Sequence, residues 1–375
     1  MVFADKDYLS GSHFLNFHFF SMRRSIYLIA TILLVFFAAE SAFAQMSRRS
    51  IKKNNKRISS YRGKKEWFAK EKRYNTLGLS FNALNYYGDL APKPSQFSTD
   101  ISFTKPAIGL SFSHRFGPRY SVSGSFMYGT LSGADNQSAD AADKDNGMFR
   151  YQRNLSFRNR IKELSVVASI DLFPNTLTHI SRVRWTPYGF LGIAGLLHNA
   201  QALAPATDLN GNPLPEAGQW VDLQPLGTEG QHAVLAEGDI NSGIKSYKKL
   251  QVAIPFGIGA RFRLNDVLDL SAELGFRYLF TDYIDDVSQN YVDLGVFGDN
   301  ELAKAMSYRS NEIVDPNLLV QTQARDGHTY NLLPGYGQEY VENMRGNKND
   351  KDTYMVTTIR LTYILGKTSN RAKFR

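Results

Sequence analysis

Between residues 74 and 366, apolar and polar side chains alternate in eight separate runs of the chain. These runs are 74–89, 106–116, 120–133, 157–173, 183–198, 249–264, 268–284 and 353–366. In 249–264, for example, the even positions are apolar, whereas the odd positions include Gln251, Arg261 and Arg263. A period of two is the pattern of a strand with one apolar face. The pattern therefore predicts eight β-strands.

Long and short connections alternate strictly between these runs. The long connections are 90–105, 134–156, 199–248 and 285–352, and the short ones are 117–119, 174–182 and 265–267. A soluble β-sandwich also has alternating strands, but it has no reason to place all its long connections at one end. Short periplasmic turns and long external loops are typical of membrane barrels. We therefore predict an all-β fold, an eight-stranded antiparallel up-and-down transmembrane β-barrel of the outer membrane, with both termini in the periplasm.

The two three-residue connections predict the register of their hairpins. Facing residues of an antiparallel pair share one side of the sheet, so their numbers add up to a constant. Even positions are apolar on both sides of 265–267, which requires a loop of odd length. Three residues satisfy this condition and place Leu264 opposite Leu268. The same argument places Phe116 opposite Tyr120.

A set of charged side chains should point into the lumen. By the same alternation, the inward set is Arg115, Glu163, Asp171, Arg261, Arg263, Asp269, Glu273, Arg277 and Arg360. In the predicted register Arg263 faces Asp269, and Arg261 lies diagonal to Glu273. An eight-stranded bore is filled by side chains, and buried charges persist only when they are paired. The network is either a structural plug or a gated polar path, and the narrow bore with charges of both signs favours the plug.

The start of the chain has the pattern of an export signal. A basic segment, 22–25, precedes the fourteen-residue apolar run 26–39, and Ala42-Phe43-Ala44 supplies the small residues of a cleavage site. The apolar run is shorter than the roughly 20 residues of a membrane helix. We expect residues 1–44 to be a leader and signal peptide, with 22–44 as the functional signal. Cleavage is expected between Ala44 and Gln45, and residues 1–21 resemble an upstream start-codon artefact.

A basic arm, residues 45–73, follows the signal. It holds twelve Lys or Arg against Glu66 and Glu71, so it accounts for the net charge of +9 of the whole chain. Such runs are usually solvated, and they seek acidic surfaces. The candidates for binding a periplasmic protein are Lys52, Lys53, Lys56, Arg57, Lys64 and Lys65. A second basic segment, the tail 367–375, follows the last strand of the barrel, 74–366. Outer-membrane lipid is the other expected partner, and no nucleic acid is expected.

Catalytic and metal-binding patterns are sparse. The sequence has no cysteine, which excludes disulfides and thiolate metal sites. Its histidines lack the spacing of metal ligands, although His198 with loop serines offers a second interpretation, a rim site for a lipid-modifying enzyme. Asp282, Asp285 and Asp286 form either a divalent-cation site or, as we favour, a solvated loop. We expect no catalytic, metal or cofactor site.

Two segments resemble one known family. They are 77–90, with the sequence LGLSFNALNYYGDL, and 273–288, whose core is Phe-Thr-Asp-Tyr-Ile-Asp-Asp-Val. Together they resemble the first and the penultimate strands of the PorG-like outer-membrane β-barrel family. The founding member of that family is a component of type IX secretion, associated with the periplasmic ring of the machine. The resemblance covers 74–366 but neither the arm nor the long loops.

Three functions are compatible with this sequence. The resemblance implies a non-enzymatic barrel that anchors or assembles an envelope machine, type IX protein secretion, through its periplasmic arm and turns. Its partner would be a protein of the secretion ring or a lipoprotein. The long external loops alternatively favour a surface-binding barrel, for adhesion or for binding a ligand such as lipopolysaccharide. The third function is the rim-site enzyme.

Overall fold

The computed structural model describes residues 68, 72–91 and 103–365. The signal peptide with its expected cleavage site at Ala44 and Gln45 lies outside these residues. The six arm residues expected to bind a partner and the basic tail lie outside them too. The fold below is that of the described residues.

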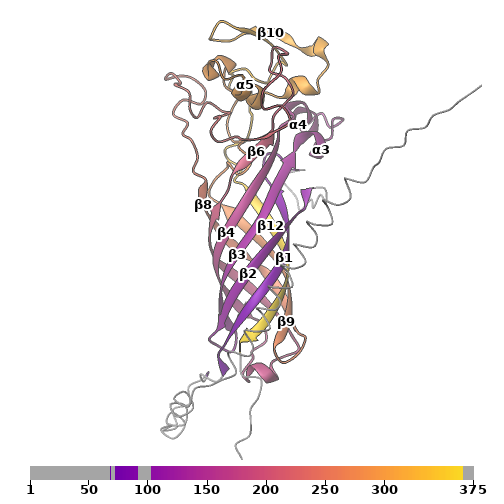
Figure 1. Ribbon diagram of the computed structural model, residues 1–375, viewed down its shortest axis with the longest axis vertical. Coiled ribbons are helices and arrows are strands. Elements are labelled where there is room, and N and C mark those ends of the chain that lie inside the picture. The colour runs from indigo at the N-terminus through magenta and orange to yellow at the C-terminus, as the bar shows by residue number, and fades with distance from the viewer. Residues whose placement is uncertain (1–67, 69–71, 92–102, 366–375) are drawn as a thin grey trace, which may run out of the picture. The chain divides into compact units, whose positions relative to one another are not determined.

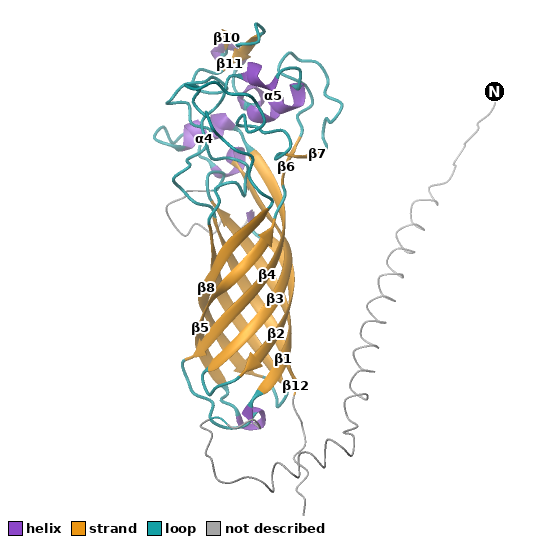
Figure 2. Ribbon diagram, turned by 90° about the vertical axis from the view of Figure 1, so that its left-hand side faces the viewer, coloured by secondary structure: helices purple, strands orange, loops and turns teal. Residues whose placement is uncertain are grey.

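Eight antiparallel strands close into a barrel (Figures 1 and 2). They are β1 (Tyr74–Tyr87), β2 (Lys105–Arg115), β3 (Tyr120–Ala134), β4 (Ser156–Asp171), β5 (Trp185–Leu197), β8 (Leu250–Arg263), β9 (Leu268–Leu279) and β12 (Thr353–Leu365). Each strand pairs with the next in this order, and β12 pairs back with β1, so no barrel strand is left with a free edge. The predicted up-and-down barrel is confirmed.

The long connections form a cap at one end of the barrel, which we call the cap end; the opposite end, with the short connections, is the turn end. The cap consists of 135–155, 198–249 and 280–352 and carries short elements (Figure 2). Its helices are α3 (Asp135–Ser138), α4 (Gly147–Arg153) and α5 (Glu301–Ser307), with 3-10 turns at Leu294–Phe297, Ser310–Glu312 and Pro316–Leu318. Its strands are β6 (Ala200–Leu203), β7 (Trp220–Asp222), β10 (Val320–Gln323) and β11 (Thr329–Leu332). A further 3-10 turn, His179–Ser181, lies at the turn end.

The cap is packed rather than loose. One apolar cluster surrounds the fully buried Tyr291 and Tyr308, and another lies between β6 and α5 around Ala202 and Met306. No helix in the described part of the chain has the length and the apolar character needed to cross a membrane. The long connections therefore fold into a small structured layer of their own.

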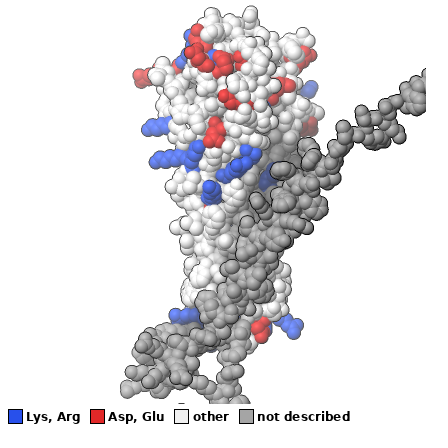
Figure 3. Space-filling model, viewed as in Figure 1, with Lys and Arg blue, Asp and Glu red and all other residues white. Residues whose placement is uncertain are grey.

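The outer wall of the barrel is apolar. Its exposed side chains include Leu79, Phe81, Leu110, Phe112, Phe126, Leu164, Val166, Ile170, Leu191, Ile193, Val252, Ile258, Leu274, Ile359 and Leu361. On the face seen in Figure 3, charged side chains gather towards the two ends of the barrel and leave an uncharged stretch between them. Aromatic pairs lie at the turn end, where Phe116 stacks on Tyr120 and Phe173 contacts Trp185 edge-on. Such a belt is stable only against another apolar phase.

Both predicted hairpin registers are confirmed. The backbone N–H of Leu264 donates to the carbonyl of Leu268 at 3.0 Å, and that of Phe116 donates to the carbonyl of Tyr120 at 3.2 Å. The predicted strand 268–284 is wrong at its end, however, because β9 stops at Leu279. Beyond this point the chain leaves the wall and enters the barrel from the cap end.

The interior of the barrel has two halves of opposite character. Towards the cap end, the inward side chains form an apolar core that includes Leu84, Tyr86, Leu131, Phe157, Ile161, Leu196, Leu279, Tyr354 and Val356. Ile284 and Val287, which belong to a cap connection, complete this core. Towards the turn end, the inward side chains are charged or carry hydroxyl groups.

Candidate functional site

The polar half of the lumen is organised around buried carboxylates. Asp171, which is 1% exposed, pairs with Arg115 at 2.6 Å and with Arg261 at 3.1 Å. These three side chains come from β4, β2 and β8, so the network crosses the lumen from wall to wall. Arg115 also donates to the carbonyl of Pro118 at 2.5 Å. Charge-assisted bonds of this kind satisfy groups that would otherwise be costly to bury.

Two further carboxylates follow the same design. Glu163 accepts from Arg277 at 3.1 Å and from the hydroxyl of Tyr354 at 2.6 Å. Glu273 accepts from Arg360 at 2.7 Å and from Tyr188 at 2.5 Å. Each carboxylate therefore has one guanidinium and one phenol as partners. The structure brings seven of the nine predicted lumen residues into three such clusters.

Arg263 faces Asp269 as predicted, but the two side chains do not form an ion pair with each other. The two residues lie opposite each other in the register of β8 and β9. Asp269 is nevertheless bound by Arg182, at 2.6 Å, and Arg263 pairs with Asp266 at 2.5 Å. The guanidinium of Arg182 also donates to the carbonyls of Asn265, Asp266 and Leu268, which hold it beside Asp269. Arg182 belongs to a connection, where strand alternation predicts nothing.

The network leaves almost no free space. The cavity among these groups and the lumenal hydroxyls of Ser113, Ser121 and Ser169 has a volume of about 40 Å³. A single water needs roughly 10–15 Å³ of such volume, so the cavity has room for a few waters and not for a continuous path. The charged half of the lumen is filled by its own side chains.

At the cap end, residues 280–288 close the lumen; we call them the mouth segment. Ile284 is fully buried and Val287 is 1% exposed, both in the apolar core. Both backbone polar groups of Ile284 form hydrogen bonds with side chains. Its N–H donates to Asp352 at 2.7 Å, and its carbonyl accepts from the Asn159 side chain at 2.6 Å. The segment thus fills the opening with apolar side chains and hydrogen-bonds its backbone to the wall.

A tyrosine joins two carboxyl groups beside this plug. The hydroxyl of Tyr86 lies 2.7 Å from Asp285 Oδ2 and 2.5 Å from Asp352 Oδ1. A hydroxyl has one hydrogen, so it donates to only one carboxylate, and the second contact requires a proton on a carboxyl group. Burial raises the pKa of Asp352 to about 7, and burial together with the charge of Asp352 also raises the pKa of Asp285. A Cβ at Gly88 would collide with both Tyr86 and Asp352, so this arrangement needs glycine there.

The other end of the mouth segment is tied to the cap. Asp286, with a left-handed φ of 69°, accepts from the hydroxyls of Thr228 at 2.6 Å and Tyr247 at 2.7 Å. Arg345 donates to the carbonyl of Asp286 at 2.6 Å and to buried Glu229 at 3.0 Å. Parts of two connections, 198–249 and the distant end of 280–352, therefore meet on this segment.

The expectation of a solvated loop at Asp282, Asp285 and Asp286 is wrong. Their exposures are 4%, 0% and 0%. Among the residues that the structure describes, no group of three or more His, Asp or Glu side chains is arranged to hold a metal ion. Buried Asp282 has a pKa raised to about 9, first by burial and then by the charge of Asp352. These carboxyls are parts of a packed closure.

His198 also belongs to the closure. Its ring is 1% exposed, stacks on Tyr247 at 5.8 Å and has Nδ1 3.1 Å from the amide of Asn159. Burial lowers the pKa of His198 to about 4, so the ring is neutral at pH 7. Its partners are an amide and a phenol ring, not the loop serines that a rim-site nucleophile requires.

Most of the residues that hold the mouth closed could not be recognised from the sequence. Tyr86, Asp352, Arg345 and Glu229 were not singled out, because they lie in different strands and connections. A signal was present in the two segments that resemble the PorG-like family. The structure brings these segments together, since Tyr86 of the first bonds Asp285 of the second.

Comparisons with known proteins give matches to a family and to solved structures. Residues 65–212 match the family described as a domain of unknown function, DUF6089, over less than half of the chain. The chain is similar to the outer membrane protein OprG of Pseudomonas aeruginosa, at 8% identity and a TM-score of 0.30, over 79% of this chain and 98% of that one. It is also similar to a major outer membrane protein of Thermus thermophilus, at 10% identity and a TM-score of 0.30, over 78% of this chain and 99% of that one. It is similar as well to the attachment invasion locus protein Ail of Yersinia pestis, at 8% identity and a TM-score of 0.27, over 78% of this chain and 97% of that one. No curated protein sequence matches the chain.

Proposed function

We propose that this chain is a non-enzymatic outer-membrane barrel that anchors or assembles an envelope machine and does not conduct solutes. The observation that carries this proposal is the double closure of the lumen. The turn-end half is filled by the paired charges around Asp171 and Glu273, and the cap-end half is filled by an apolar core that includes Ile284 and Val287 and borders the Glu163–Arg277 pair. A channel or transporter needs a path or a bistable gate, whereas an anchor needs only a rigid barrel in the membrane.

The outer membrane is the compartment that fits the barrel. The predicted export signal and the apolar outer wall support it. In this location the turn end and both termini face the periplasm and the cap faces outward, as the lengths of the connections suggest. The protein should fractionate with the outer membrane and migrate differently on a gel when unheated than when boiled. Recovery of the mature protein from the soluble periplasm would contradict this location.

The machine that we favour is the type IX secretion system. The support is the resemblance of 77–90 and 273–288 to the PorG-like family, together with the physical meeting of these two segments at the mouth. The partner would bind the basic arm, 45–73, and would be an acidic periplasmic protein, either a ring component or a lipoprotein. Contacts of a basic arm with an acidic partner weaken with salt.

Neutralising the arm tests this proposal. The variant replaces Lys52, Lys53, Lys56, Arg57, Lys64 and Lys65 by Ser. The matched control replaces the basic residues of the tail, Lys367, Arg371, Lys373 and Arg375, by Ser. Both proteins should keep heat-modifiable mobility, because neither segment contains a barrel strand. Only the arm variant should lose its crosslinked periplasmic partner. The same partners in both variants would contradict the proposal.

A second candidate function, binding of lipopolysaccharide at the surface, is favoured by one feature. Arg160 and Lys162 point outward on β4, immediately on the cap side of exposed Leu164, and neither forms an ion pair within the described ranges. Unpaired cations next to an apolar belt suit the phosphates of an anionic lipid. Changing both to Ser should reduce co-purified lipopolysaccharide, whereas changing the exposed cap residues Lys144 and Lys348 should not.

A further inference from the structure

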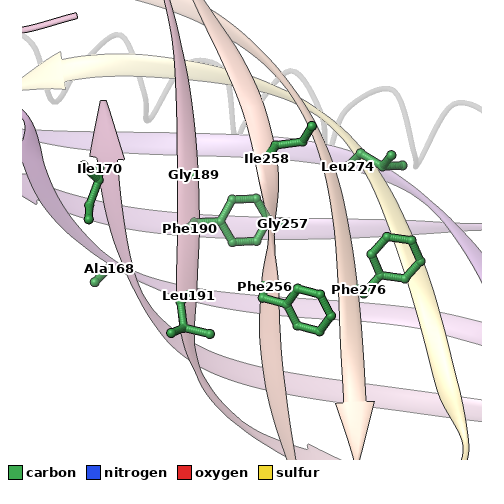
Figure 4. A pocket seen from close by; sticks show the side chains of 10 residues that line it. All are labelled: Ala168, Ile170, Gly189, Phe190, Leu191, Phe256, Gly257, Ile258, Leu274 and Phe276. Carbon is green, nitrogen blue, oxygen red and sulfur yellow. The ribbon is translucent and has the colours of Figure 1, made fainter. Parts of the chain in front are cut away.

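A furrow crosses the outer wall of the barrel in its turn-end half. Two adjoining hollows, of about 810 and 910 Å³, share Ile170, Gly189, Ile258 and Leu274 in their linings. The lining residues come from successive strands, and Figure 4 shows no side chain at Gly189 between Ile170 and Ile258. The lining is almost wholly apolar.

The furrow follows from a line of small outward residues. Gly189 pairs with Ile170 on one neighbouring strand and with Ile258 on the other, so this row of outward residues across three strands has no side chain at its middle position. In the next row towards the turn end, Pro187 pairs with Ala260, which pairs with Ala272. The rest of the outer wall has mostly large aliphatic or aromatic side chains. The small residues therefore leave an oblique hollow between larger neighbours.

The furrow does not open into the lumen. On the inner side of the wall, the ring of Phe190 lies against the backbone of Gly257 and Gly275, so closely that a Cβ on either glycine would be 2.8 Å from its Cζ. The hollow is therefore a surface site that faces the membrane. A lateral exit from the barrel would need this ring to move.

At its turn end the furrow reaches a lone cation. Arg119, in the connection between β2 and β3, lines the second hollow and is exposed. No ion pair of Arg119 occurs in the described part of the chain, because the nearby carboxylate of Asp171 is bound by Arg115 and Arg261. The edge-on pair Phe173–Trp185 lies at the same end, and such aromatics mark the level of the lipid headgroups.

We propose that the furrow binds one phospholipid, with an acyl chain along Gly189, Ala260 and Ala272 and its phosphate at Arg119. The apolar hollow suits the chain, and a guanidinium binds phosphate in a fixed two-point geometry. The site lies in the leaflet at the turn end of the barrel. The inference rests on the proposed location of the barrel in a membrane and is independent of the anchoring role.

Lipid binding to the full mature protein in mild detergent tests this inference. Native mass spectrometry would measure retention of dioleoyl phosphatidylglycerol, with dioleoylglycerol as the probe that lacks a phosphate. Gly189→Leu fills the furrow, and the only neighbour within 4 Å of the added Cβ is the carbonyl of Gly257 at 3.9 Å. The matched control is Gly195→Leu, at an outward position of the same strand with nothing within 4 Å and outside the furrow.

The expected result is one tightly held phosphatidylglycerol for each barrel. Gly189→Leu should weaken its retention roughly tenfold, the effect of displacing about two methylene groups. Gly195→Leu should leave retention unchanged. Arg119→Gln should weaken phosphatidylglycerol about tenfold, the scale of a hydrogen bond to a charged group, and leave dioleoylglycerol unaffected.

Equal retention by the two leucine variants, or an equal loss of both lipids in Arg119→Gln, would overturn the inference. Heat-modifiable mobility of every variant would exclude misfolding as the cause. Failure of the wild-type protein to fractionate with the outer membrane would instead refute the location, so the two failures are distinguishable.

Discussion

The contact of Tyr86 with Asp285 and Asp352 links the closure of the barrel to a proton. Both carboxyl groups are fully buried, or nearly so, and the neighbouring carboxyl groups of Asp89 and Asp282 also raise the pKa of Asp285. Lys351 is the cation that partly offsets the charge at Asp352. Since two carboxylates cannot both accept the single hydrogen of Tyr86, the closed arrangement holds an extra proton.

Raising the pH should therefore loosen the mouth. The pKa of Asp352 is raised from 3.8 to about 7. A carboxyl with a raised folded-state pKa stabilises the folded arrangement fully below its unfolded pKa and loses this contribution as pH rises through the folded pKa. Amide exchange at 284–288, corrected for its intrinsic pH dependence, should accelerate roughly tenfold from pH 6 to pH 8 and then level off, because above about pH 7 the closed arrangement has itself lost the proton.

Asp352→Asn should remove most of this pH dependence. An amide accepts from the N–H of Ile284 and donates to Tyr86 at any pH, as the protonated carboxyl does. The control is Asp350→Asn, an exposed carboxylate of the same connection, which should behave as the wild type. Identical pH dependence in all three proteins would show that the shared proton does not hold the mouth.

At the same scale, the sequence predicts side-chain direction better than side-chain pairing. Alternation directs Glu163 and Arg277 inward, and the structure has them there as partners. It also directs Asp269 inward, but the partner of Asp269 is Arg182, which comes from a connection whose conformation has no period. Direction depends only on the position in a strand, whereas pairing depends on every group that reaches the same place.

Among the elements, β9 and the mouth segment show where the pattern misleads. Apolar even positions alternate from Leu268 to Phe280, and one strand that continues to 284 is our interpretation of this run. The chain leaves the wall at Leu279, because Ile284 fills the apolar opening and Asp352 and Asn159 bind its backbone. In the sequence, an apolar residue that fills the lumen has the same spacing as an apolar residue that faces outward. Only the folded barrel, with its opening at the cap end, shows which of the two a residue is.

Ile284→Ala should destabilise the closed barrel. Removing a buried aliphatic side chain typically costs 2–5 kcal/mol through lost burial and the cavity left behind. The size-matched control is Ile193→Ala, an outward residue of β5 that is 67% exposed and whose place lipid or detergent can take. The temperature at which the folded gel band disappears should fall clearly only for Ile284→Ala. An equal fall in both variants would mean that Ile284 does not plug the opening.

On the scale of the whole molecule, the fold is predictable because it is repetitive. Strand period and the alternation of long and short connections are enough to predict the closed barrel and its hairpin registers. The cap is not predictable in this way, since α5, β6 and β7 are short and pack through contacts such as that of Arg345 with Glu229. The arm, on which the proposed partner depends, lies outside the described residues.

Single-channel recording in planar bilayers tests the closed lumen most directly. The purified full mature protein, with its folded state checked by heat-modifiable mobility, would be recorded at pH 6, where the mouth is expected to be closed. The double closure predicts no steady ion current, because the charged half is filled and the apolar half excludes water. Stable, uniform single-channel steps of the wild-type protein at this pH would contradict the closed, anchoring barrel.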